Sequence, residues 1–122
     1  MTPGLTISAR EVDAIDLLDA LGDDARRATW TLDRWVEATG CEHAKRLHEL
    51  SEREATVPAD ELWPLLDGTQ LIGGRIVGDL GDGAPWVMIE SIRGDAWDVR
   101  SSDREVLARI VARYPGATPL PD

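Results

Sequence analysis

Phenylalanine is absent from this sequence and tyrosine occurs once, so the five tryptophans must supply nearly all of the aromatic bulk of a hydrophobic core. Cysteine also occurs once, as Cys41, which excludes an internal disulfide. No apolar run reaches the roughly 18 residues that a membrane-spanning helix needs, and no charged-then-apolar leader opens the chain. We therefore expect a protein of the reducing cytoplasm that does not associate with membranes.

The composition is that of a globular protein. The 122 residues fit a single domain spanning 1–122, and no repeat, linker or shift in composition divides them. Hydrophobic residues make up 43% of the chain and charged residues 30%, which argues against disorder. Lysine occurs once, whereas Ala, Gly, Asp and Arg are abundant. This bias indicates a base-rich genome, and we expect a bacterial protein.

The negative charge is unevenly distributed along the chain. The formal net charge is −10, and residues 93–122 are neutral because five Arg balance five acidic residues there. Residues 1–92 therefore carry the entire excess of acid. Such a chain is a poor candidate for binding nucleic acid through its phosphates, and a fair one for meeting a basic protein partner.

The N-terminal half reads mainly as helices. Apolar spacing predicts a first helix over residues 9–21, with a capping box of Ser8 and Glu11 and Gly22 as the terminating residue. Residues 28–37 fit a strand or a helix face, and their Trp, Thr and Val content favours a strand. Residues 41–54 are helical by composition, and a short helical turn follows Pro58.

The C-terminal half reads as a meander of strands and a final helix. Strands are expected over residues 69–80, 85–92 and 96–100, the first weakened by two adjacent glycines and the last two joined by a turn at Gly94-Asp95. A helix over residues 103–113 begins with a capping box of Ser102 and Glu105. The prediction is an α+β fold: a three- or four-stranded antiparallel sheet packed against N-terminal helices and a C-terminal helix.

An edge strand of this sheet offers a possible homodimer contact. The segments "TQLIGGRIV" and "RATWTLDRW" are the two candidates for such an edge.

The sequence contains no pattern that predicts catalysis, a metal site or a cofactor. His43 and His48 lie five apart and do not share a helix face, and Cys41 lies two helical turns, roughly 10 Å, from His48. The glycines of "GGRIVGDLGDG" do not lead into a helix, so they do not form a phosphate-binding loop. We expect Cys41 to be structural and both histidines to lie at the surface.

One group of acidic residues is a candidate partner-binding surface. Asp has a low helix propensity, yet several Asp residues lie in or beside the first predicted helix. No Lys or Arg between residues 11 and 25 offsets their negative charges. Two interpretations remain open: a stripe retained for a basic partner, or an ordinary solvated helix face. The stripe consists of Asp13, Asp16 and Asp19, extended by Asp23 and Asp24.

Two functions follow from these observations. The first is a non-catalytic interaction protein, such as an inhibitor, an immunity or antitoxin-like protein or an adaptor, that presents its acidic face to a basic protein. The alternative is a small enzyme or ligand-binding domain with a tryptophan-lined pocket between sheet and helices. Candidate pocket residues for the alternative are Trp86, Glu90, Trp97 and Asp98, of which the two carboxylates lie on neighbouring strands.

Overall fold

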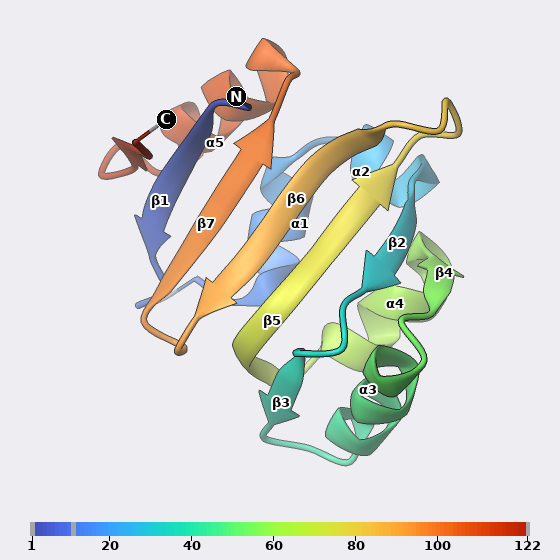
Figure 1. Cartoon of the computed structure of the whole chain (residues 1–122). Coiled ribbons are helices and arrows are strands. Elements are labelled where there is room, and N and C mark those ends of the chain that lie inside the picture. The colour runs from blue at the N-terminus through green and yellow to red at the C-terminus, as the bar shows by residue number, and fades with distance from the viewer. Residues whose placement is uncertain (1, 11, 122) are drawn as a thin grey trace.

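The computed structural model describes residues 2–10 and 12–121, in which five helices and eight strands are interspersed along the chain (Figure 1). The expected α+β class is compatible with it, but the sheet is wrong in size: it has eight antiparallel strands, not three or four. The elements are β1 (Gly4–Ser8), α1 (Ala14–Ala20), α2 (Asp24–Arg27), β2 (Thr29–Leu32), β3 (Glu37–Thr39), α3 (His43–Glu52), β4 (Thr56–Pro58), α4 (Ala59–Leu66), β5 (Gln70–Asp79), β6 (Pro85–Ile92), β7 (Ala96–Ser101), α5 (Arg104–Arg113) and β8 (Thr118–Pro119).

The sheet is built around the meander that the sequence predicts. Its strand order is β4-β2-β5-β6-β7-β1-β8, and β3 pairs with β5 beyond the end of β2. Strands β5, β6 and β7 are consecutive in the chain and adjacent in the sheet, joined by hairpins. Both chain ends meet at one side, because β1 pairs with β7 and with β8 (Figure 1).

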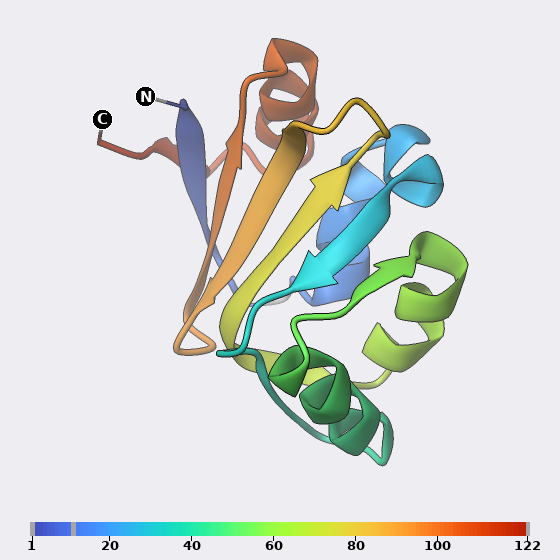
Figure 2. The same cartoon turned by 45° about the vertical axis from the view of Figure 1, so that its right-hand side comes forward.

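The helices cover one face of the sheet and leave the other bare. Figures 1 and 2 show α1, α2, α4 and α5 behind the strands, with α3 beside α4 and β3. Alternate strand residues point into this helical layer, as expected for an antiparallel sheet with one solvated face. The core between the layers holds side chains with no more than 2% exposure, among them Leu17, Trp30, Leu62, Ile89 and Val99.

The predicted first helix begins too early. The residues before it, 4–8, to which no element was assigned, form β1, because Leu5 and Ile7 alternate with Thr6 and Ser8 and their backbones pair with β7. The helix starts only at Ala14, where the Asp13 side chain accepts a hydrogen bond from the first turn. The predicted capping residue Ser8 ends β1, and its proposed partner Glu11 lies outside the described residues.

The ambiguous segment 28–37 is a strand followed by a tight turn and the start of β3. Gly74 of β5 allows this turn to pack directly against the β5 backbone. A Cβ at Gly74 would lie 2.2 Å from Val36 Cα, and the φ angle of Gly74 is +92°. The glycine pair noted in the sequence therefore permits a close approach of two backbones, and β3 pairs with β5 through a bulge there.

Two other local predictions are shifted by a residue. Helix α5 is capped by Asp103, whose side chain accepts from Glu105 N at 3.0 Å, so the predicted Ser102–Glu105 box is wrong. The β6–β7 turn places positive φ angles at Arg93 and Gly94, one position before the predicted pair. In the helix cap, Asp103 takes the capping position predicted for Ser102, and both residue types are good caps. In the turn, the two positive φ angles lie one residue earlier than predicted.

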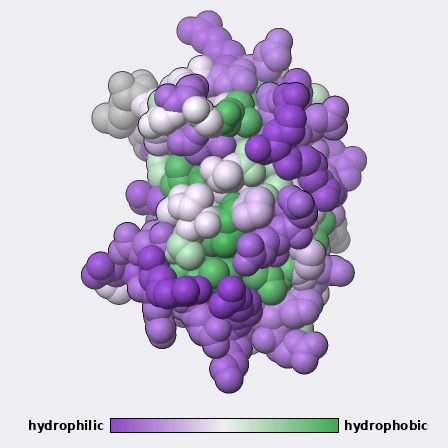
Figure 3. Space-filling view, turned by 90° about the vertical axis from the view of Figure 1, so that its right-hand side faces the viewer, coloured by the Kyte–Doolittle hydropathy of each residue, from purple (hydrophilic) through white to green (hydrophobic). Residues whose placement is uncertain are grey.

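Neither segment proposed for an edge-strand dimer lies at an edge. Strand β5 is interior, and β2 lies between β4 and β5. The outer strands are the short β3, β4 and β8, of which β4 and β8 contain Pro58 and Pro119, so they offer few free backbone groups. Figure 3 looks onto the β4 side and shows hydrophobic side chains in the middle of the surface, framed by hydrophilic ones.

Across residues 2–10 and 12–121, none of the helices has the length and apolarity required to cross a bilayer.

Candidate functional site

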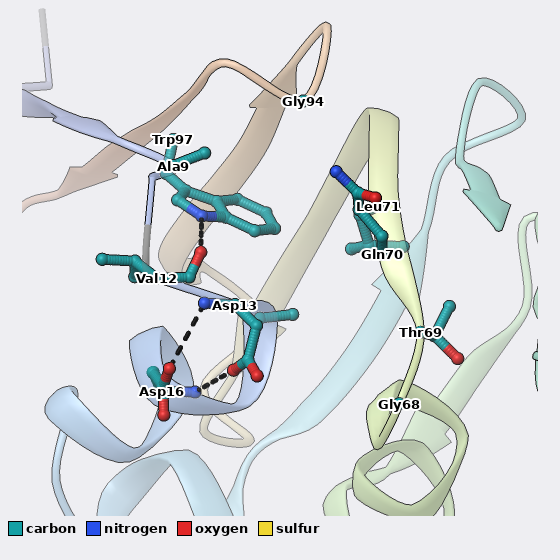
Figure 4. Close-up of a pocket in the computed structure, with 11 residues that line it drawn as sticks. Ala9, Val12, Asp13, Asp16, Gly68, Thr69, Gln70, Leu71, Gly94 and Trp97 are labelled. Atoms are coloured by element: carbon teal, nitrogen blue, oxygen red, sulfur yellow. Dashed lines mark hydrogen bonds between the residues drawn. The ribbon is translucent and has the colours of Figure 1, made fainter. Parts of the chain in front are cut away.

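A cavity of about 420 Å³ opens at one end of the sheet, beside the start of α1 (Figure 4). One wall comes from the connection between β1 and α1, and the opposite wall from the connection between α4 and β5. Its lining residues are Ala9, Val12, Asp13, Ala14, Asp16, Gly68, Thr69, Gln70, Leu71, Gly94 and Trp97. The volume lies within the roughly 300–1,000 Å³ that is usual for small-ligand pockets.

Trp97 forms the aromatic wall of this cavity. It lies on β7 and points to the helical side of the sheet, where it is 3% exposed. Its Nε1 donates a hydrogen bond to Val12 O at 2.9 Å, which fixes the plane of the ring. Figure 4 shows the indole ring across the cavity from Gln70 and Leu71. Sequence reasoning selected Trp97 for a pocket shared with Trp86, Glu90 and Asp98, none of which lines this cavity.

Asp13 and Asp16 supply the negative charge at the rim. Asp13 Oδ1 accepts from Asp16 N at 2.8 Å, and Asp16 Oδ2 accepts from Asp13 N at 3.3 Å. Each carboxylate therefore keeps one oxygen that these two bonds do not use. Within residues 2–10 and 12–121, no ion pair joins either carboxylate to a basic side chain.

The opposite wall is held rigidly, and one free amide projects from it. Thr69 is buried, its Oγ1 donates a hydrogen bond to Leu65 O at 2.8 Å, and Cys41 Sγ lies 3.0 Å from Thr69 Oγ1. Gln70 is exposed, and its amide nitrogen lies on the side of Gly94. Gln70 thus offers the cavity a neutral donor and acceptor group.

The remaining acids of the predicted stripe have other partners or lie apart. Asp19 pairs with Arg26 at 3.3 Å and also accepts from Trp63 Nε1 at 3.4 Å. Asp24 pairs with Arg27. Asp23 is exposed and caps α2 without a side-chain hydrogen bond. Within the second half of the stripe, the two arginines of α2 thus pair with Asp19 and Asp24, and Asp23 has no ion pair among the described residues.

The four residues of the alternative pocket do not converge. Trp86 points to the helical side, where its Nε1 donates to Asp103 Oδ2 at 3.3 Å and its ring meets Trp30 edge to face at 6.4 Å. Glu90 and Asp98 are direct cross-strand neighbours on the uncovered face. Glu90 has Arg75 as a counter-charge at 3.5 Å, so the two carboxylates are not an isolated acid pair.

Cys41 and His48 have structural partners of their own. Cys41 contacts Thr69, as above, and His48 Nε2 accepts from Ala38 N at 3.0 Å. In the described part of the chain, no group of three or more His, Cys, Asp or Glu side chains is placed to hold a metal ion.

Sequence reasoning missed Gln70, Val12 and the α4–β5 connection as parts of the site. Val12 lies in one segment and Gln70 directly follows the α4–β5 connection in another, and only the packing of α1 and α4 against the sheet brings the two segments together. No local pattern marks such residues.

Comparison with known proteins gave no match to a family model, to a curated protein or to a solved structure.

Proposed function

We propose that this chain is a non-catalytic binding protein that takes a basic side chain of a protein partner into the cavity beside Trp97. One observation carries the proposal: an indole ring and the carboxylates of Asp13 and Asp16, which no basic side chain of the described residues neutralises, line the same cavity. An inhibitor, an immunity or antitoxin-like protein and an adaptor are forms that such a protein takes. Because Cys41 forms no internal disulfide, the proposal places this encounter in the cytoplasm.

The chemistry of the cavity fits a guanidinium or ammonium group. A cation over an indole ring is stabilised by about 0.5–2 kcal/mol, and a guanidinium also donates to carboxylate oxygens in the plane of its fork. Gln70 provides a neutral acceptor at the opposite wall. The net charge of −10 attracts a basic partner over a distance, so association would be faster at low ionic strength.

The test uses the tryptophan indole N–H groups as reporters. The five tryptophans give up to five indole signals in a nitrogen–proton correlation spectrum, and the signal of Trp97 comes from the cavity wall. We titrate the protein with a short arginine peptide and with the same peptide containing citrulline, which keeps the shape and loses the charge. The expected result is a shift of the Trp97 signal with arginine only.

Charge variants make the assignment specific. Asp13→Asn and Asp16→Asn together should abolish the shift, because both rim charges are lost. Asp23→Asn is the matched control, since it removes one charge from an exposed acid that does not line the cavity. An equal response to citrulline, or an undiminished response in the Asp13/Asp16 double variant, would refute the proposal.

A free alkylguanidine carries the same cationic group as the arginine side chain. Comparing its affinity with that of the peptide distinguishes a protein partner from a small ligand. If the peptide binds more tightly than the alkylguanidine, residues around the cavity contact the peptide chain and the partner is a protein. If both bind equally, the cavity recognises a small cationic ligand, which is the ligand-binding alternative.

A further inference from the structure

The uncovered face of the sheet carries a regular grid of charged and apolar side chains. Strand pairing aligns Val77, Met88 and Arg100 in one row across β5, β6 and β7. The next row, two residues further along each strand, contains Arg75, Glu90 and Asp98. Figures 1 and 2 show that no helix covers this face.

We propose that this face packs against the same face of a second copy of the chain, so that two sheets form a sandwich. The geometry that fits is a two-fold axis parallel to the sheets and perpendicular to the strands, passing between the two rows. Rotation about it exchanges the rows, so Arg100 of each copy faces Asp98 of the other. The same rotation sets Met88 opposite the other copy's Glu90.

The charge pattern is complementary in this arrangement. By contrast, an axis parallel to the strands that passes between β6 and β7 would set Glu90 against Asp98 of the other copy, and like charges facing each other are destabilising. The axis perpendicular to the strands forms two Arg100–Asp98 contacts. It also leaves the Arg75–Glu90 pair at 3.5 Å within each copy intact. Arg100 is free for this role, since its Nη1 donates only to Thr2 O among the described residues, at 3.0 Å.

A hollow in the same face receives an apolar side chain in this arrangement. The hollow has a volume of about 220 Å³ and lies beyond the first row. Val77, Met88 and Arg100 of this face line it, together with the buried residues Trp86, Val87 and Ser101. The rotation that exchanges the rows brings Ile92 of the other copy over this hollow, because Ile92 lies one step beyond the second row on β6. Packed sheets lie roughly 10 Å apart, which lets such side chains interdigitate.

The size of the face predicts a weak dimer. The five neighbouring strands β2, β5, β6, β7 and β1 span roughly 19 Å between the outermost strand axes, at a spacing of about 4.8 Å. The area buried by such a contact falls at the lower end of the range for specific interfaces. We therefore expect a dissociation constant in the micromolar range or weaker. The outer strands β4 and β8 do not offer a competing contact, because they are short and contain proline.

Sedimentation over a wide range of concentrations tests the proposal on the whole chain without any partner. We expect the unaltered chain to dimerise. Arg100→Asp should abolish the dimer because two pairs of like charges then face each other, and Asp98→Arg should do the same. The variant carrying both changes restores the opposite charges and should dimerise again.

Three controls complete the experiment. Arg53→Asp changes the net charge as Arg100→Asp does but lies at the end of α3, and it should leave the dimer intact. Met88→Glu sets a carboxylate against the other copy's Glu90 and should abolish the dimer by an independent route. Asp13→Asn alters the cavity on the helical side of the sheet and should have no effect, so that this proposal and the cavity proposal fail separately.

Circular dichroism and thermal unfolding confirm that each variant is folded. A chain that stays monomeric at millimolar concentration overturns the proposal. So does a dimer that survives both single charge reversals, or a dimer that the double reversal fails to restore although the variant is folded.

Discussion

Asp13 and Asp16 hold each other in place at the first turn of α1. The Oδ1 atom of Asp13 accepts from Asp16 N at 2.8 Å, and the Oδ2 atom of Asp16 accepts from Asp13 N at 3.3 Å. Their spacing of three residues thus forms a capping box, in which each side chain accepts a hydrogen bond from a backbone N–H group that the helix itself leaves without a partner. The same bonds fix both carboxylates at the rim of the cavity. Asp13 and Asp16 therefore stabilise the start of α1 and also provide the charges for the proposed binding.

Removing the cap should destabilise the protein, and removing only its charge should not. Asp13→Ala is expected to lower the free energy of unfolding by about 1 kcal/mol, whereas Asp13→Asn should change it little, because Asn is an equally good cap. Urea denaturation of the variants measures both values. Asp23→Ala is the control, since Asp23 makes no side-chain cap bond. Equal losses for Asp13→Ala and Asp23→Ala would contradict the role of the capping bonds.

Gly74→Ala should be among the most damaging single-methyl changes in this chain. The new Cβ would lie 2.2 Å from Val36 Cα, so β5 and the turn before β3 would have to separate. Gly81 is the control: its φ angle of +100° is similarly unfavourable for alanine, but no atom lies within 4 Å of the added Cβ. Gly81→Ala should cost about 1 kcal/mol from backbone strain alone. Thermal unfolding should show a clearly larger loss for Gly74→Ala, and similar losses would disprove the close-approach argument.

Trp35 should account for nearly all of the tryptophan fluorescence that iodide can quench. Its side chain is 70% exposed, whereas the other four tryptophans are 7% exposed or less. A quenching titration of the unaltered chain should therefore show one accessible class. Trp35→Phe should remove that class and leave stability nearly unchanged, as is usual for exposed positions. Strong quenching that persists in this variant would mean that a second tryptophan reaches solvent.

Trp97 should control the affinity for a cation in the cavity. Trp97→Phe keeps an aromatic face with a weaker attraction for cations, and Trp97→Leu removes the face. We expect binding of the arginine peptide to weaken moderately in the first variant and more strongly in the second. A loss of 1 kcal/mol corresponds to about a fivefold change in Kd. Calorimetric titration measures this order, and equal affinities of both variants would exclude a cation–aromatic contact.

The parts of the fold that sequence analysis found have strong local signals. The strands of the meander, β5 to β7, alternate or are continuously apolar and are bounded by Gly and Pro, and their predicted bounds agree with the structure within a residue or two. Helix α5 is similarly well marked by its apolar stripe. β1 was missed, because the five residues "GLTIS" acquire strand structure only by pairing with β7, far along the chain.

The candidate site was predicted only in fragments. Asp13, Asp16 and Trp97 were each selected, but for two different hypotheses and on two separate surfaces. Their meeting depends on the hydrogen bond from Trp97 Nε1 to Val12 O, which joins residues 85 positions apart. The pairing of Asp19 with Arg26 was equally out of reach, because it depends on how α2 packs beside α1, whereas the Asp24–Arg27 pair is an i,i+3 contact within α2 that the sequence spacing allows.

The sequence by itself determined the α+β class, the central meander, the last helix and the excess of acid in residues 1–92, because periodicity, turn residues and charge are local properties of the chain. The tertiary structure alone decided the size of the sheet, the partners of the acids, the cavity beside Trp97 and the bare face with its grid of charges. Those features depend on strand pairing and helix packing between distant segments, whose contacts have no counterpart in local spacing.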